Sequence, residues 1–141
     1  MIELKDYWAQ HRDGNELSLT PEIEEDAERT VKLANQLLVE ASLAGVNLHL
    51  NPATGTHVSS GWRPPSVNAN TQGAAPNSKH MTGQAIDIYD PDGDLDNWLI
   101  TDSGLKALED LGLWIEHPLA TKGWSHLQII PPGSRHRVYF P

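Results

Sequence analysis

The sequence predicts a small α+β domain in which an antiparallel sheet is backed by helices. Three observations indicate this fold class. One long amphipathic helix precedes every strand, short strand-like segments follow with Gly- and Pro-rich turns between them, and a second helical region lies among these strands. At 141 residues the chain fits one domain, because domains commonly contain about 100–150 residues. We therefore expect a single domain over residues 1–141.

The clearest element is a helix over about residues 21–44. Thr20 suits the N-cap, Pro21 suits the first helical position, and Gly45 lies where a C-terminal cap is expected. Apolar residues recur at spacings of three and four, as on one buried face: Ile23, Ala27, Val31, Ala34, Leu38 and Ala41. This helix carries no motif of its own, so we interpret it as a packing element.

Two strands are expected next, over residues 46–50 and 56–62, with a turn at 51–55. Residues 63–79 are rich in Pro, Asn and Gly and predict a long loop, a feature that is often functional in compact domains. Apolar and polar residues then alternate over 84–89, which predicts a strand.

The C-terminal half predicts a helical region over about residues 94–111, broken near 101–104. Short strands are expected over residues 113–116, 124–130 and 137–140.

An acidic run at residues 90–96 superficially resembles an EF-hand calcium loop. The position of the required turn glycine holds Leu95, and the position of the last glutamate holds Thr101. An Asp-Gly turn followed by a helix cap explains this run better than calcium binding.

Composition and charge argue against several classes of protein. The net charge of −9 disfavours nucleic-acid binding, because phosphate contacts need clustered Lys and Arg. No stretch approaches the roughly 18 consecutive apolar residues of a membrane span. Cysteine is absent, so His and carboxylate groups would have to hold any transition metal. We expect a monomer with no nucleic-acid partner and no membrane span.

Two histidines and one aspartate form a candidate metal site. His80 ends the long loop, and Asp87 follows inside a predicted strand. His126 lies in a later predicted strand and shares a face with Gln128. Two imidazoles and one carboxylate leave a tetrahedral zinc with one open position, the composition of a catalytic zinc site. The spacing alone leaves a second interpretation open, in which Asp87 bonds its strand neighbours and the two histidines are unrelated.

These residues lie in a pattern that resembles the zinc D-alanyl-D-alanine carboxypeptidase family, which includes phage endolysins and shares its fold with the hedgehog signalling domain. The matching motifs are Ser78-x-His80-x-x-Gly83-x-Ala85-x-Asp87, the later Trp124-x-His126, and the upstream Ser60-Gly61-Trp62-Arg63. They cover about residues 56–130 in the family's order. The resemblance implies a zinc peptidase of the hedgehog/DD-peptidase fold.

The resemblance implies a role for each matching residue. His80, Asp87 and His126 would be the zinc ligands. Arg63 would hold the substrate carboxylate or the oxyanion of the tetrahedral intermediate, which suits a planar, permanently charged guanidinium. Ser78 would bind the substrate backbone or brace His80.

Trp62 and Trp124 adjoin the same motifs. Most of the five tryptophans are expected in the core, but these two would also wall a substrate groove.

The general base is the one departure from the family pattern. Many members place a glutamate three residues before the last ligand, where this chain has Gly123. Glu116 is the nearest upstream carboxylate and ends a predicted strand, so we expect it to be the base. His117 is the substitute candidate.

The expected function is hydrolysis of peptidoglycan stem peptides by a D,D-carboxypeptidase or an endopeptidase, with Zn²⁺ as cofactor. The N-terminal segment lacks the basic start and apolar run of a secretory signal. A protein made in the cytoplasm would then reach the cell wall or periplasm through a holin, as an endolysin, or on a phage virion. The alternative is a non-catalytic zinc-stabilised binding module of the same fold, which the missing glutamate at position 123 favours.

Overall fold

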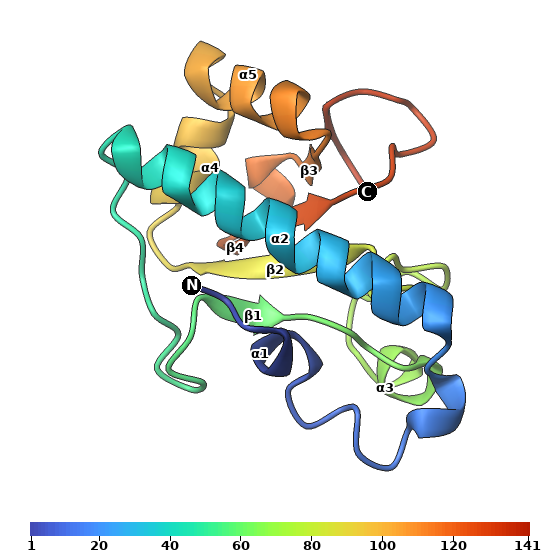
Figure 1. The fold of residues 1–141 in the computed structure, drawn as a ribbon. Coiled ribbons are helices and arrows are strands. Elements are labelled where there is room, and N and C mark those ends of the chain that lie inside the picture. Colours follow the sequence, from blue (N-terminus) through green and yellow to red (C-terminus); the bar gives the residue numbers. More distant parts are fainter.

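A five-stranded sheet with the order β1-β2-β4-β3-β5 forms the centre of the molecule (Figure 1). The computed structural model describes residues 1–141. The strands are β1 (Val58–Ser60), β2 (Ala85–Asp90), β3 (Trp114–Glu116), β4 (Gly123–Gln128) and β5 (Val138–Tyr139). The α-helices are α1 (Leu4–Trp8), α2 (Pro21–Leu43), α3 (Pro65–Ala69), α4 (Asp94–Leu99) and α5 (Asp102–Leu111), and the short 3-10 helices are η1 (Glu16–Ser18) and η2 (Pro118–Ala120). The predicted α+β class is confirmed. No helix combines the length and the apolar character needed to cross a membrane.

The two longest strands, β2 and β4, form the antiparallel pair that organises the sheet. Asp87 lies directly opposite His126 in this pair. The sheet departs from the antiparallel arrangement at one edge, where β5 runs parallel to β3. After β4 the chain passes through a loop over residues 129–137 before it returns, so β5 enters the sheet in the same direction as β3.

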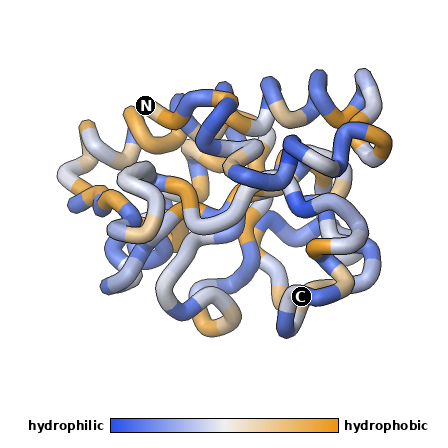
Figure 2. Tube along the Cα trace, turned by 90° about the horizontal axis from the view of Figure 1, so that it is seen from below, coloured by the Kyte–Doolittle hydropathy of each residue, from blue (hydrophilic) through white to orange (hydrophobic).

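Side chains that alternate along β2 separate an apolar face from a polar one. Ile86 and Ile88 belong to the buried core, as does Leu127 on β4. The helix α2 crosses the sheet in Figure 1, and the Thr30 hydroxyl on α2 donates a 2.7 Å hydrogen bond to the Gly83 carbonyl just before β2. Figure 2 shows α2 along one side of the molecule and the C-terminus on the opposite side. The helical layer therefore covers the apolar face of the sheet, and Asp87 extends from the other face.

The predicted helices agree with the structure. Thr20 caps α2 by accepting a 3.2 Å hydrogen bond from the Ile23 backbone N–H. The predicted break in the second helical region is confirmed, because α4 ends at Leu99 and Thr101 caps α5 by accepting from the Gly104 N–H. These elements were predictable because their caps and apolar spacing are local features of the sequence.

The prediction of a strand over residues 46–50 is wrong. Val46 and Leu48 pack against the core, while Leu50 is exposed, and the segment pairs with no strand. An isolated β-bridge between Asn51 and Thr56 follows it, and a 2.8 Å hydrogen bond from His57 Nδ1 to the His49 carbonyl joins it to the next segment. Apolar residues alternate with polar ones at Val46, Leu48 and Leu50, but the segment has no neighbouring strand, and its first two apolar side chains pack against the core.

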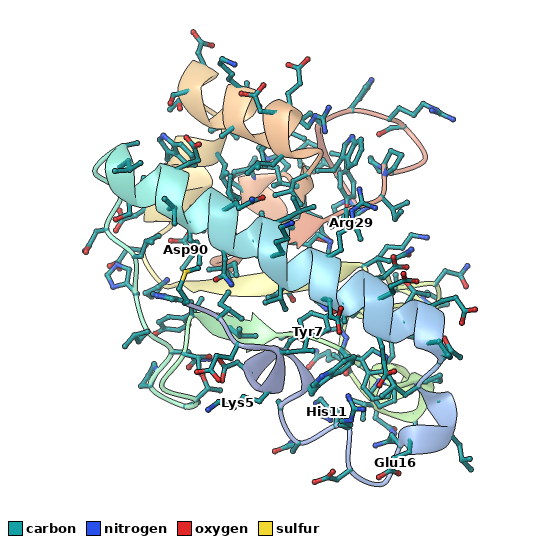
Figure 3. The ribbon with its side chains drawn as sticks, in the orientation of Figure 1. Lys5, Tyr7, His11, Glu16, Arg29 and Asp90 are labelled. Atoms are coloured by element: carbon teal, nitrogen blue, oxygen red, sulfur yellow. The ribbon has the colours of Figure 1, made fainter.

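The long loop over residues 63–79 contains α3, and the N-terminal segment contains α1; neither helix was predicted. Tyr7 on α1 is fully buried and donates a 2.8 Å hydrogen bond from its hydroxyl to the Ala85 carbonyl (Figure 3). The Tyr7 carbonyl accepts from the Trp62 N–H, and a Cβ on Gly61 would collide with that carbonyl. The helix α1 is thus packed tightly against the residues that precede Arg63.

Two buried aspartates link β2 to α4. Both carboxylate oxygens of Asp90 accept hydrogen bonds from the backbone of α4, at the N–H groups of Leu95 and Asp96. The N-cap residue of α4 is Gly93, which has no side chain to cap the helix, so Asp90 instead binds the first turn from the end of β2. Asp96 is only 2% exposed, and its Oδ2 atom accepts a 2.7 Å hydrogen bond from the Thr121 hydroxyl, while Oδ1 has no partner. Burial, with the charge of Asp90 nearby, raises the pKa of Asp96 to about 6.

We expect Asp96→Asn to raise the free energy of unfolding at pH 8 by on the order of 1–3 kcal/mol and to leave it nearly unchanged at pH 4. The folded-state pKa of Asp96 lies above its ordinary value, so the folded protein binds more protons than the unfolded chain between about pH 4 and pH 6. Stability from this group is therefore present below that window and is lost as the pH rises through about 6. Urea unfolding from pH 4 to pH 8, with chelator present, measures the difference.

The exposed turn residue Asp92 provides the control, since Asp92→Asn should shift stability little at either pH. Parallel stability curves for Asp96→Asn and the wild type would contradict the expectation.

Candidate metal centre and cleft

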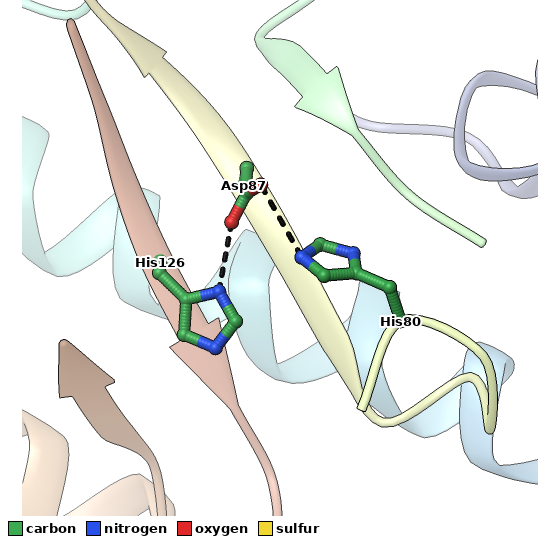
Figure 4. A group of neighbouring side chains, drawn as sticks. All are labelled: His80, Asp87 and His126. Atoms are coloured by element: carbon green, nitrogen blue, oxygen red, sulfur yellow. Dashed lines mark hydrogen bonds and ion pairs between the residues drawn. The ribbon is translucent and has the colours of Figure 1, made fainter. Parts of the chain in front are cut away.

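His80, Asp87 and His126 converge from three segments of the chain (Figure 4). Asp87 extends from β2 between the two histidines. His80 Nε2 lies 3.2 Å from Asp87 Oδ2, and His126 Nδ1 lies 2.8 Å from Asp87 Oδ1. All three side chains are buried, at 2%, 8% and 6% exposure for His80, Asp87 and His126. The structure therefore brings together the three residues that were predicted as metal ligands.

Backbone contacts from the Gly61 to Arg63 segment hold His80 in place. His80 Nδ1 donates a 2.7 Å hydrogen bond to the Gly61 carbonyl, and the Arg63 N–H donates to the His80 carbonyl. Gly83 turns the chain from His80 into β2 with a φ of +75°, and a Cβ there would lie 2.6 Å from the Ile23 carbonyl oxygen on α2. A glycine at this position thus lets the loop approach the helix and return to the sheet.

Asp87 and the two histidines shift one another's pKa values because they lie so close together. Burial alone would raise the pKa of Asp87, but the charge of His80 and hydrogen bonds from both histidines lower it below its ordinary value. Burial lowers the pKa of His126, yet the hydrogen bond and negative charge of Asp87 outweigh burial and raise that pKa to about 9. Without a metal, the aspartate and His126 form a buried ion pair that a cation would replace.

The donor atoms fit a zinc ion. The Gly61 carbonyl can only accept, so His80 Nδ1 carries a proton. His80 Nε2, which faces Asp87, is therefore the nitrogen that would bind a metal in place of its contact with the aspartate. One ligand atom from each of the three residues lies within 4.8 Å of the others. Two imidazole nitrogens and one carboxylate oxygen form the donor set of an open zinc site.

A cleft of about 650 Å³ opens over the three residues. Among its lining residues are all three candidate ligands, Glu116 and Arg63. The loops at residues 72–79 and 132–134 form parts of its walls, together with the C-terminal residues 139–141.

Arg63 reaches the cleft beside Ser78. Its Nη2 atom donates a 3.2 Å hydrogen bond to Ser78 Oγ, and its buried Nε atom has no partner. Burial lowers the pKa of Arg63, while the charges of Asp87 and Glu116 oppose that shift. Ser78 Oγ also accepts from the His80 N–H, so Ser78 braces both the arginine and the candidate ligand. An arginine with a free buried donor in a cleft is suited to an anionic group of a ligand.

Glu116 occupies the cleft, whereas His117 does not. Glu116 Oε1 lies 3.8 Å from His126 Nδ1, and burial raises the pKa of Glu116 despite the opposing charge of His126. His117 caps η2 by accepting from the Leu119 N–H at Nδ1, and its ring stacks on Phe140. The geometry favours Glu116 over His117 as the group beside the candidate metal.

The two site tryptophans have different environments. Trp124 lines the cleft, as expected, and its role as a substrate contact stays a prediction. The corresponding prediction for Trp62 requires correction, because Trp62 is fully buried, packs edge-to-face on Trp8 and donates from Nε1 to the Met81 carbonyl. Trp62 supports the His80 loop from inside the core.

Two cleft residues had no predicted role. Gln128 lies on β4 next to His126, and Tyr139 on β5 donates a 2.6 Å hydrogen bond to Gln128 Oε1. The alternation of β4 already placed Gln128 on the face of His126. Nothing local in the sequence indicated that β5 would bring Tyr139 to the same place.

The α+β fold and the His/Asp/His cluster beside a buried glutamate and an arginine define a candidate metal-dependent hydrolase. The sequence matches the family model described as Peptidase M15 over residues 21–107, more than half of the chain. This chain belongs to the peptidase M15 family, the family of the zinc D-alanyl-D-alanine carboxypeptidases. Comparison with curated proteins and comparison with solved structures give no match. The matched segment contains Arg63, His80 and Asp87 and ends before Glu116 and His126.

Proposed function

We propose that this protein is a zinc peptidase that hydrolyses the stem peptides of bacterial peptidoglycan. One observation carries the proposal: a single cleft holds the three candidate ligands together with Glu116 and Arg63. Membership of the peptidase M15 family supports the peptidase reaction. The substrate rests on the resemblance to the zinc D-alanyl-D-alanine carboxypeptidases.

Each cleft residue would contribute one part of the reaction. Zinc held by His80, Asp87 and His126 would acidify a water molecule and polarise the scissile carbonyl. Glu116 would take the proton of the attacking water and deliver it to the leaving amine. Its raised pKa suits a group that must both accept and release a proton. Arg63 would bind the substrate carboxylate or the oxyanion that develops during attack.

Two bond choices fit this site. A D,D-carboxypeptidase would release the terminal D-alanine, and an endopeptidase would cut within the stem or its cross-link. We propose a phage setting for either activity, as an endolysin released through a holin or as a virion-borne domain, with action at the cell wall or in the periplasm.

A non-catalytic zinc-binding module of the same fold is the second candidate. Gly123 favours it, because its φ of +104° would strain a glutamate at the position where many family members carry the base. The two functions therefore differ in whether Glu116, on β3, replaces that base.

Mass spectrometry of muropeptides incubated with the zinc-loaded protein tests the proposal. We expect new product masses that disappear when a chelator is added and return with zinc. Release of a single terminal residue would indicate a carboxypeptidase, and cleaved cross-links would indicate an endopeptidase. If the zinc-loaded protein leaves the muropeptides unchanged, the peptidase function is overturned and the non-catalytic zinc-binding module remains as the candidate function.

A further inference from the structure

The environment of His126 on the side away from Asp87 determines which of its nitrogen atoms carries a proton. His126 Nδ1 faces Asp87, and Nε2 lies 2.9 Å from Gln128 Oε1. In a neutral imidazole one nitrogen donates and the other accepts. The partner of Nε2 therefore decides whether Nδ1 has a lone pair for a metal.

The amide of Gln128 has only one orientation that satisfies its neighbours. Its Nε2 atom lies 2.8 Å from the Ile130 carbonyl, which can only accept a hydrogen bond. The nitrogen end of the amide must face Ile130, so the oxygen end faces His126. This oxygen also accepts the 2.6 Å hydrogen bond from the Tyr139 hydroxyl. With an acceptor opposite it, His126 Nε2 must be the donor.

Tyr139 connects this chain of hydrogen bonds to the strand that carries Glu116. Glu116 and Tyr139 are partners in the parallel pairing of β3 and β5, and the Tyr139 carbonyl accepts from the His117 N–H at 2.7 Å. Gln128 is only 4% exposed. The bond between Gln128 and His126 is thus buried, and the bond from Tyr139 ties β5 to it.

We propose that Gln128 and Tyr139 are positioning residues that hold His126 with its proton on Nε2 and present Nδ1 to the metal. The proposal rests on the metal site of the proposed function. It adds the C-terminal strand β5 to the parts of the chain on which that site depends. Outer hydrogen bonds of this kind orient metal-binding histidines, and their loss commonly weakens metal affinity by about 10–100-fold.

Three variants test the proposal through zinc affinity, measured by competition with a chelator dye. We expect Gln128→Leu, which removes the acceptor, to weaken zinc binding by about 10–100-fold. Gln128→Glu keeps an acceptor oxygen for His126 and Tyr139 but places its other oxygen against the Ile130 carbonyl, so it should restore only part of the affinity. Tyr139→Phe keeps the ring in place and should give a smaller loss of several-fold, because Gln128 still faces His126.

Gln84 provides the matched control. It is a glutamine just before β2 whose side chain bonds Asp26 and Thr82, away from His126, so Gln84→Leu should leave zinc affinity unchanged. Circular dichroism of each metal-free variant establishes that it is folded.

A second readout detects the proton itself. In ¹H–¹⁵N spectra of the zinc-loaded protein, we expect a slowly exchanging imidazole N–H at His126 Nε2 in the wild type. The Gln128→Leu variant should lose that protection. Wild-type zinc affinity retained in Gln128→Leu, with the N–H still protected, would overturn the positioning role while leaving the proposed function intact. No zinc binding by the wild type would instead overturn the metal site on which both depend.

Discussion

We expect Glu116→Gln to slow hydrolysis of peptidoglycan peptides by about 10²–10⁴-fold while zinc stays bound. Glutamine keeps the shape of the side chain but cannot accept the proton of the attacking water. Glu116 lies 3.8 Å from His126 and is not one of the three candidate ligands, so the metal should not be lost. Product formation by mass spectrometry and zinc content by elemental analysis measure the two effects separately.

Two further substitutions serve as a control and as a test of the alternative base. Glu109→Gln alters an exposed glutamate on α5 and should leave the rate unchanged. His117→Ala should retain most of the activity, because His117 caps η2 and is not among the residues that line the cleft. Full activity in Glu116→Gln together with inactivity in His117→Ala would transfer the role of base to His117.

The second large effect is expected at Asp87. We expect Asp87→Asn to weaken zinc binding by more than about 100-fold, beyond the range for outer partners, and to remove hydrolysis with it. The carboxylate lies between both histidines and is the only negative charge among the three candidate ligands. A neutral amide oxygen would be a poorer ligand and would leave the cation's charge uncompensated in a buried site.

Chelator competition measures the zinc affinity of this variant, and circular dichroism checks its fold. Asp102→Asn is the control, since Asp102 is an exposed residue in the first turn of α5. If Asp87→Asn bound zinc as tightly as the wild type, Asp87 would not be a ligand.

The helices show how much of the fold was predictable. The boundaries of α2 follow from Thr20, Pro21 and the apolar spacing, and the break between α4 and α5 follows from the cap at Thr101. Such features depend on residues a few positions apart, so the sequence displays them directly. The segment at residues 46–50 shows the opposite case, because its alternation resembled a strand while no partner strand lies beside it.

The site divides in the same way. His80 and Asp87 were recognisable from one short motif, and Gly83 within that motif provides the turn between them. The position of Trp62 could not be predicted in this way, because Trp62 is next to Arg63 in the sequence but packs in the core against Trp8. Two residues that are adjacent in the sequence can lie in different environments, because the backbone directs their side chains to opposite sides.

By itself the sequence determined the α+β class, the α2 helix and the residue types that can hold a metal, because these depend on local spacing and on donor chemistry. Only the tertiary structure decided that Glu116 lies in the cleft while His117 lies outside it. It also decided that Tyr139 reaches Gln128, because the parallel pairing of β5 with β3 follows a loop whose path no local pattern encodes. Contacts between residues distant in the chain depend on how the strands pair in the sheet, so they cannot be predicted from local sequence patterns.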